Sequence, residues 1–266
     1  MYSSLQLARK YWKYYKNASN GKGHGMHSPF VFDFILRVLN NKNHYQASAA
    51  IEKLRSEVRR DKTMLDIEDL GAGSRNKKTP ASRTVKQLAR TALKSPKYAQ
   101  VLYRLVKHYQ PATIIELGTS LGLTTAYLSE ANPEARIWTI EGSRSVHLKA
   151  MEHFKKLGLK NIKALHGAFD EWLPNLLDSV PVIDLAYIDG NHRYEPTIQY
   201  FHQLLAKRTD HTILVFDDIH WSAEMEQAWE EIKLHPEVRY TIDIFFLGFV
   251  FFRSEFKVKQ DFVIRY

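Results

Sequence analysis

From Pro111 onward, short β-rich runs alternate with segments of helical length and period. The runs are TIIEL (113–117), RIWTIE (136–141), IKALH (162–166), IDLAYID (183–189) and TILVFDD (212–218). Such alternation predicts a parallel sheet with helices on both faces. The tail VRYTIDIFFLGFVFFR (238–253) has two β-rich runs flanking Leu247-Gly248, which predicts a closing antiparallel hairpin, and QDFVIRY (260–266) predicts a further edge strand.

The front half of the chain predicts helices instead. Three of them are expected to begin where a hydroxyl residue precedes proline, at Ser28-Pro29, Thr79-Pro80 and Ser95-Pro96. The hydroxyl bonds the free amides of the first turn, and proline suits the first helical position. A fourth helix is predicted over about 47–60, where Ile51, Leu54 and Val58 recur at helical spacing. We therefore predict an N-terminal helical cap over 1–94 and a main α/β domain over 95–266.

Composition narrows the class of protein. The chain has 266 residues, 44% hydrophobic and 25% charged, as globular proteins do. The apolar run at 244–252 is shorter than the ~20 residues of a membrane-spanning helix, and the N-terminus carries charge where a signal peptide is apolar. There are no cysteines, which excludes disulfides, thiolate metal sites and a cysteine nucleophile. These features predict a cytoplasmic protein without a transmembrane segment.

Charge is unevenly distributed along the chain. Residues 1–110 carry 22 Lys and Arg against 7 Asp and Glu, a net +15, whereas the remainder is net −6. The basic half is either a solvated helical surface or a region that attracts an anionic partner or substrate.

Two glycine turns compete as the nucleotide-binding turn. DLGAGSR (69–75) follows an acid-rich run and precedes no helix, so it lacks the scaffold of such a site. In the second turn, TIIEL is the strand, Gly118 and Gly122 form the turn, and LTTAYLSEA (123–131) is the helix. The next strand ends in Glu141, 25 residues after Glu116, where an acid accepts hydrogen bonds from ribose hydroxyls. No third glycine packs a pyrophosphate-binding helix, which favours an adenosyl ligand without phosphates.

At these motifs the sequence resembles the class I S-adenosylmethionine-dependent methyltransferases, and among them the catechol and caffeoyl-CoA O-methyltransferase-like group. IIELGTSLGLTTAYLS, WTIEGS and HGAFDEWLP resemble that group's first motif, ribose-binding acid and adenine-flanking segment. The resemblance implies a Rossmann-like fold with a seven-stranded, mostly parallel sheet that ends in the antiparallel hairpin. The cofactor-binding residues it implies are Glu116, Gly118, Thr119, Ser120, Gly122, Glu141, Gly142, Ser143, Ala168, Phe169 and Asp189.

The ends of the fourth and fifth predicted strands carry dense polar chemistry. Asp189, in YIDGNHRYE, and Asp217 and Asp218, in VFDDIHWS, are expected to converge there. Three carboxylates suit Mg²⁺ or another hard divalent cation, which can lower the pKa of a substrate oxygen. The alternative is that these acids cap helices or contact the methionine end of the cofactor.

The group's pattern matches Asp189, Asp217 and Trp221 but departs from this sequence at two positions. His192 stands where metal-dependent members have a lysine base, and Asp218 stands where they have asparagine. Histidine, with a pKa near 6.5, can act as a base at neutral pH. Asp189 and His192 are therefore the predicted catalytic residues, and Arg75, His220 and Trp221 are predicted to contact the substrate.

Other segments fall outside these motifs. HGMHSPFVF, with His24 and His27, and the ending FVIRY resemble an uncharacterised bacterial, Bacteroidetes-like branch of methyltransferases. The basic, aromatic segment YSSLQLARKYWKYYKNAS (2–19) is predicted to pack within the protein or a homodimer, or else to meet an anionic membrane or nucleic acid. No nucleic-acid-binding module is recognisable.

The sequence as a whole predicts an S-adenosylmethionine-dependent O-methyltransferase for a small-molecule acceptor. Two alternatives remain: another transferase, such as an aminopropyltransferase, on the same fold, or a nucleic-acid- or membrane-surface-binding protein with a vestigial cofactor fold.

Overall fold

The computed structural model describes residues 1–41, 47–67 and 82–266. The chain divides into two compact units. The first unit joins Met1–Asn40 to Leu177–Tyr266, and the second is Asn41–Leu176. These bounds differ from the division at 94/95, and a cap domain over 1–94 stays a prediction.

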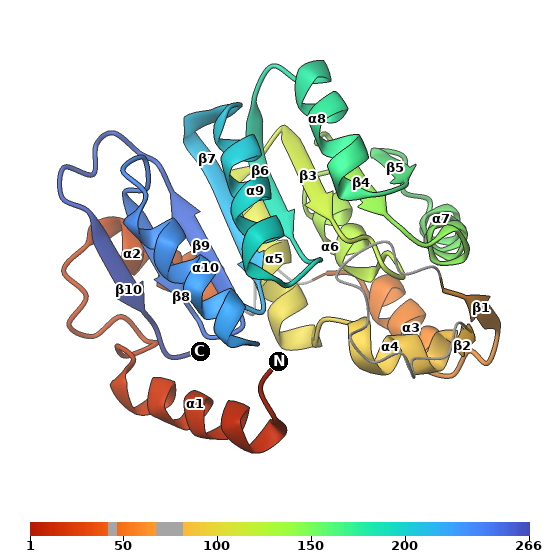
Figure 1. Ribbon diagram of the computed structural model, residues 1–266, viewed down its shortest axis with the longest axis horizontal. Coiled ribbons are helices and arrows are strands. Elements are labelled where there is room, and N and C mark those ends of the chain that lie inside the picture. The colour runs from red at the N-terminus through yellow and green to blue at the C-terminus, as the bar shows by residue number, and fades with distance from the viewer. Residues whose placement is uncertain (42–46, 68–81) are drawn as a thin grey trace. The chain divides into compact units, whose positions relative to one another are not determined.

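The first unit contains five strands of the main sheet (Figure 1). They are β6 (Ile183–Ile188), β7 (Arg208–Asp217), β8 (Tyr240–Asp243), β9 (Leu247–Phe251) and β10 (Gln260–Val263). β6 and β7 are parallel, whereas β9 runs antiparallel to both β7 and β8, which confirms the predicted hairpin. The turn is wrong by a few residues, because Leu247 and Gly248 belong to β9. A Cβ on Gly248 would lie 2.7 Å from the Trp229 ring, so this glycine permits close packing.

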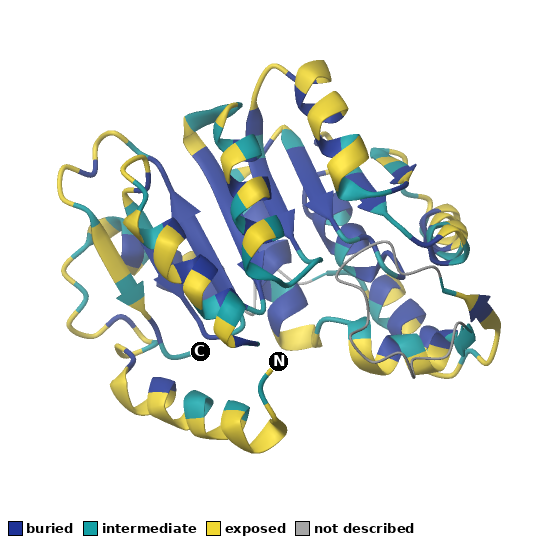
Figure 2. Ribbon diagram, viewed as in Figure 1, coloured by how far each residue is buried: buried dark blue, intermediate teal, exposed yellow. Residues whose placement is uncertain are grey.

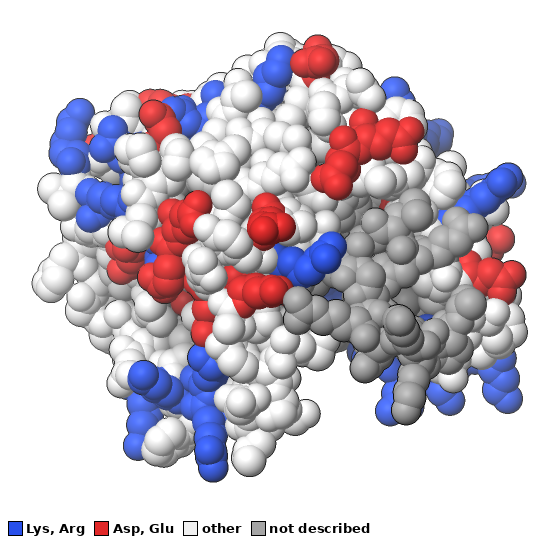
Figure 3. Space-filling model, viewed as in Figure 1, with Lys and Arg blue, Asp and Glu red and all other residues white. Residues whose placement is uncertain are grey.

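The helices of the first unit come from both ends of the chain. They are α1 (Ser4–Asn17), α2 (Pro29–Phe34), η1 (Ile35–Leu39), α9 (Tyr194–Leu205) and α10 (Ala223–Leu234). Ser28 caps α2, as predicted, by accepting a hydrogen bond from Val31 N. The N-terminal segment joins the C-terminal one through a parallel bridge between Ser19 and Ile264. Figure 3 shows Lys and Arg side chains gathered over α1.

The second unit contains the other three main-sheet strands, β3 (Thr113–Leu117), β4 (Arg136–Glu141) and β5 (Ile162–His166), all parallel. The helices between and beside these strands are α5 (Pro96–Tyr109), α6 (Leu123–Ala131) and α7 (Arg144–Leu157), and α8 (Phe169–Ser179) follows β5. β3 is buried along almost its whole length (Figure 2), and its sequence TIIEL is apolar except at Thr113 and Glu116. Within the described ranges the two units hold eight main-sheet strands, one more than the seven predicted, because β10 pairs parallel with β8.

A small subassembly of the second unit contains α3 (Ala49–Val58), β1 (Met64–Asp66), β2 (Ser82–Thr84) and α4 (Val85–Ala92). β1 and β2 form an antiparallel pair. The predicted helix start at Thr79-Pro80 lies outside the described residues; among the described residues, 82–84 form β2 instead of helix, and the helix begins at Val85. The signal missed was the capping box of Thr84 and Gln87, in which each side chain bonds the other residue's backbone amide. No helix in the described ranges is long and apolar enough to cross a membrane.

Candidate functional site

The glycine turn predicted to hold the cofactor lies directly after β3. The amides of Gly118 and Thr119 both donate to the carbonyl of Ile140 at the end of β4, at 3.0 and 3.1 Å. Gly118 and Ser120 have positive φ values of 104° and 48°. A serine in the left-handed region is uncommon, and such strained residues cluster where a ligand is held. The turn is therefore fixed to the neighbouring strand in a conformation that few residues adopt.

Gly122 ends this turn and has a packing role. It is the N-cap of α6, with φ of 74°. A Cβ at this position would lie 2.6 Å from the Phe154 ring and 3.2 Å from Ala150 Cβ, both on α7. Gly122 thus lets α6 and α7 approach each other, a role that the third glycine serves in dinucleotide-binding turns. Contact between Gly122 and the cofactor stays a prediction.

Glu141 connects the turn to the end of β4. Its Oε2 accepts a hydrogen bond from Ser120 N at 2.7 Å, and its Oε1 accepts one from Ser143 N at 3.0 Å. Burial raises the pKa of Glu141, and the bonds from the Ser143, Ser120 and Gly142 amides oppose that rise. Each carboxylate oxygen still has acceptor capacity beyond one amide. A diol can therefore bind here without displacing the turn.

Glu116, which was predicted to bind the cofactor, lies wholly inside the unit. Its Oε2 accepts hydrogen bonds from Thr125 Oγ1 at 2.5 Å and Thr139 Oγ1 at 2.6 Å. Burial, as the largest cause, raises the pKa of Glu116 to about 7. The hydroxyl of Thr139 also lies 2.5 Å from that of Thr119. These contacts give Glu116 a structural role beneath the turn, joining β3, β4 and α6, and its contact with the cofactor stays a prediction.

The predicted adenine-flanking residues Ala168 and Phe169 follow β5 and are half-buried. The amide of Gly167 donates to the Glu141 carbonyl at 3.0 Å, which ties this segment to the acid predicted to bind ribose. Gly167 has φ of 145°, and a Cβ there would lie 2.6 Å from Trp172 Nε1. Sequence reasoning missed both Gly167 and Trp172, although the glycine stands in the quoted HGAFDEW segment.

The first unit holds the residues predicted for catalysis. Register pairs Ile188 with Phe216, so Asp189 and Asp217 leave neighbouring strand ends. The hydroxyl of Tyr187 donates to Asp189 Oδ2 at 2.9 Å, and His192 Nε2 lies 3.6 Å from Asp189 Oδ1. Both the His192 and Asp189 side chains remain partly exposed, at 27% and 19%. This geometry places an imidazole beside an oriented carboxylate, an arrangement suited to proton transfer.

The three carboxylates predicted as metal ligands are Asp189, Asp217 and Asp218. In the described part of the chain, no three His, Asp or Glu side chains are grouped so that they could hold a metal ion. Asp217 is buried, at 1% exposure. Asp218 has φ of 52°, and its amide donates to the Phe246 carbonyl at 2.8 Å. The two neighbouring aspartates thus lie in different environments, and metal binding stays a prediction.

His220, predicted to contact substrate, lies between two carboxylates. Its Nδ1 is 3.1 Å from Glu226 Oε1 and its Nε2 is 2.8 Å from Asp243 Oδ2. Burial lowers the pKa of His220, but the hydrogen bonds and charges of Asp243 and Glu226 outweigh it and raise the pKa overall. Glu226 also bonds Lys10 Nζ, at 2.8 Å, and the Tyr2 hydroxyl, at 2.7 Å. His220 therefore belongs to a network that ties α1 to α10 and β8.

The other residues singled out in the sequence are Trp221, Arg75, His24 and His27. The Trp221 amide donates to the Asp218 carbonyl at 2.9 Å, while its own carbonyl accepts from Tyr2 N at 3.0 Å. Arg75 and all of the DLGAGSR turn (69–75) lie outside the described residues. His24 and His27 are exposed on the loop before α2.

Comparison with known proteins bears on the fold and the family. Residues 115–219 match the family model of a methyltransferase domain. The chain is similar to PaMTH1, a methyltransferase from Podospora anserina solved with S-adenosylhomocysteine, at 14% identity and a TM-score of 0.61, over 96% of this chain and 98% of that one. It is also similar to TomG, an O-methyltransferase from Streptomyces achromogenes solved with S-adenosylmethionine, at 18% identity and a TM-score of 0.59, over 82% and 96%.

A third similar structure is an O-methyltransferase from Bacillus cereus, at 16% identity and a TM-score of 0.57, over 77% of this chain and 92% of that one. Identities this low establish the fold, and the family model adds the class of domain. The Bacteroidetes-like branch stays a prediction. The chain therefore has the fold of these methyltransferases, and its residues 115–219 match a methyltransferase domain.

Proposed function

We propose that the protein transfers the methyl group of S-adenosylmethionine to an oxygen of a small-molecule acceptor. The observation that carries the proposal is the carboxylate of Glu141, which accepts the amide of Ser120 and so lies against the glycine turn. The similar structures from Streptomyces achromogenes and Bacillus cereus, both O-methyltransferases, support oxygen as the acceptor atom.

For the cofactor, we assign each predicted residue a role that its surroundings allow. Glu141 accepts the ribose hydroxyls, since its oxygens have capacity beyond their amide bonds. Ala168 and Phe169 flank the adenine. The backbone at Gly118–Ser120 approaches the methionine end of the cofactor, and Gly142 and Ser143 line the same side of the site. Behind this backbone, the hydroxyl of Thr119 contacts that of Thr139.

For the acceptor, His192 is the proposed general base. Its imidazole removes the proton of the acceptor hydroxyl while the oxygen lone pair attacks the methyl carbon in line with the carbon–sulfur bond. That bond breaks with its electrons going to sulfur, so the sulfonium becomes the neutral thioether of S-adenosylhomocysteine. Asp189 faces His192 and stabilises the imidazolium that forms.

A divalent cation is a separate, finer part of the proposal. When bound, Mg²⁺ would supply a Lewis acid for the acceptor oxygen. The described carboxylates are not arranged as its ligands, so no step above depends on it. A chelator should leave S-adenosylmethionine binding unchanged, and a loss of turnover that Mg²⁺ restores would establish the metal. A cytoplasmic location and a homodimer likewise remain predictions.

The test is a methyl-transfer assay with radiolabelled S-adenosylmethionine and a panel of phenols and catechols. General-base catalysis predicts that His192→Ala lowers turnover by roughly 10²–10⁴-fold. His192→Lys restores a base of the type found in the related metal-dependent enzymes and should recover part of the rate. Equal turnover in the wild type and His192→Ala would overturn the role of His192, whereas absence of cofactor binding would overturn the function itself.

A further inference from the structure

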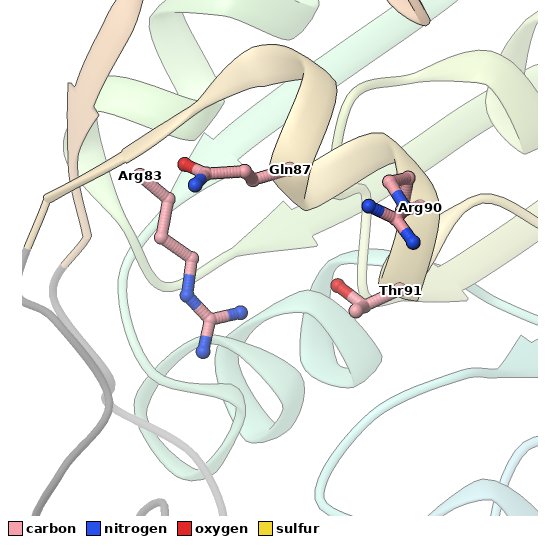
Figure 4. A pocket seen from close by; sticks show the side chains of 4 residues that line it. All are labelled: Arg83, Gln87, Arg90 and Thr91. Atoms are coloured by element: carbon pink, nitrogen blue, oxygen red, sulfur yellow. The ribbon is translucent and has the colours of Figure 1, made fainter.

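One face of α4 and the strand before it lines a hollow of about 400 Å³. The described residues that line it are Arg83, Gln87, Arg90 and Thr91. Gln87, Arg90 and Thr91 are spaced by three and one residues, which places them on one side of α4, and Arg83 comes from β2. Figure 4 shows the four side chains around the same space. On the other side of α4, Val85 and Ala89 are buried. The helix therefore presents a polar face to the hollow.

The described lining of this hollow carries positive charge only. Both charged residues of the described lining are arginines, and no carboxylate in the described ranges pairs with either guanidinium. In the capping box, the side-chain oxygen of Gln87 accepts hydrogen bonds from the backbone amide and the hydroxyl of Thr84. These bonds fix the Gln87 side chain, and its NH₂ group can donate to a ligand. Two guanidinium groups and an amide NH₂ are donors only. Such a set matches an oxyanion.

A chain of contacts leads from the proposed ribose-binding acid to this face. Glu141 accepts the Ser143 amide, and the Ser145 hydroxyl, on the first turn of α7, donates to the Asp66 carbonyl at 2.6 Å. Asp66 pairs across the small sheet with Ser82, whose hydroxyl donates to it at 2.7 Å, and Arg83 follows. The hollow is thus held to the part of the unit that carries Glu141.

We propose that this hollow binds the phosphate or carboxylate group of a small molecule. Its volume lies within the range of small-ligand sites. Arginine forks bind either anion through paired hydrogen bonds. The site does not depend on methyl transfer, so it stands or falls separately from the proposed function.

The test is calorimetric titration with inorganic phosphate and with phenyl phosphate at constant ionic strength. Arg83→Ala and Arg90→Ala should each weaken binding roughly tenfold, as loss of a charge-assisted hydrogen bond does. Lys86→Ala is the matched control, because it removes one exposed charge from α4 outside the lining and should change binding less than about twofold.

Tighter binding of phenyl phosphate would make an organic anion the ligand, and equal binding would make free phosphate the ligand. Both results support the site. Absence of saturable binding, or equal losses in the two arginine variants and Lys86→Ala, would overturn it.

A second, independent observation concerns the outward face of α1. Met1, Leu5, Ala8, Trp12 and Tyr15 recur at intervals of four and three residues and are all exposed; Leu5 is 64% and Trp12 61% exposed. The opposite face, with Leu7, Tyr11 and Tyr14, packs against Phe245 and Phe246. α1 thus has one apolar stripe inside and another outside.

The cations of α1 indicate what the outer stripe meets. Arg9, Lys13 and Lys16 are exposed beside it, and Ser4–Asn17 contains no acidic residue. A second copy of the same helix would bring like charges together, whereas an anionic lipid surface attracts them. We infer that α1 lies on an anionic membrane surface, with Trp12 at the headgroup level.

Sedimentation of the full chain with phosphatidylcholine vesicles, with and without phosphatidylserine, tests this inference. Binding should require phosphatidylserine, and Leu5→Ala with Trp12→Ala should weaken it by about a hundredfold or more, as the lost apolar burial predicts. Leu234→Ala, another exposed apolar residue, should leave it unchanged. Equal binding to neutral vesicles, no binding, or a dimer that the double variant dissociates would overturn the inference.

Discussion

The two units use acidic side chains in different ways. In the second unit, Glu141 bonds backbone amides of its own loop and of the glycine turn. In the first unit, Asp243 and Glu226 bond His220, and Glu226 also bonds Lys10 and Tyr2, more than 200 residues away in the chain. The acid with local partners is the one predicted to bind a ligand, whereas the acids with distant partners join separate segments of the fold.

The strongest test of the cofactor side of this comparison is Gly122→Ala. The added Cβ meets the Phe154 ring, and the residue keeps a left-handed backbone, so we expect the free energy of unfolding to fall by about 3–4 kcal/mol. Gly158→Ala is the matched control, since Gly158 has φ of 68° with nothing near its Cβ position, and it should cost only about 1 kcal/mol. Urea denaturation measures both, and equal losses would contradict the packing role.

The pH dependence of stability tests the buried acid beneath the turn. The pKa of Glu116 is about 7 in the folded chain, above the ordinary 4.5, so the native state holds a proton that the unfolded state releases. Stability should therefore fall as the pH rises from about 4.5 to 7, by roughly 2–3 kcal/mol between pH 5 and 8. Glu116→Gln should remove this fall. Parallel profiles for the variant and the wild type would contradict the assignment.

On the other side of the comparison, His220→Ala should destabilise the first unit by about 1–2 kcal/mol, because Glu226 and Asp243 lose the cation between them. The pKa of His220 is raised in the folded chain. The stability that it contributes should therefore be complete below the unfolded pKa of 6.5 and be lost as the pH rises through the folded value. The His220→Ala variant should bind S-adenosylmethionine as the wild type does. A variant that loses affinity but not stability would show that His220 contacts a ligand instead.

The smallest effect concerns the ion pair that joins α1 to Glu226. Lys10→Ala should cost less than about 1 kcal/mol, since both side chains are partly exposed. Lys13→Ala removes a neighbouring exposed charge and should cost almost nothing. A loss in Lys10→Ala several times larger than this would indicate that α1 contributes more to the network than the geometry implies.

Much of the α/β architecture could be predicted from sequence because its signals are local. The β-rich runs at 113–117 and 136–141 coincide with β3 and β4, since apolar periodicity and burial agree there. The prediction of helix over residues 82–84 was wrong, because these residues form β2 and the helix begins after Thr84, which forms a capping box with Gln87. The pairing of β2 with β1 joins residues 16 or more positions apart, so no local signal indicates it.

The candidate site was predictable to a similar extent. The approach of Glu141 to the glycine turn follows from the order strand, turn, helix, strand. The surroundings of His220 do not, because its partner Asp243 lies 23 residues away, and its other partner Glu226 is bonded by Tyr2 and Lys10 from the far end of the chain. The packing role of Gly122 was equally hidden, since its partner Phe154 lies on the next helix.

Isothermal titration of the pure protein with S-adenosylmethionine tests the central claim most directly. The account predicts binding in the micromolar range, on the order of the affinities that enzymes show for their substrates. Glu141→Ala should weaken it by about tenfold or more, as loss of hydrogen bonds to a charged group does, while Glu134→Ala, an exposed acid of the same unit, should not. Absence of binding by the wild type, or unchanged affinity in a folded Glu141→Ala variant, would contradict the account.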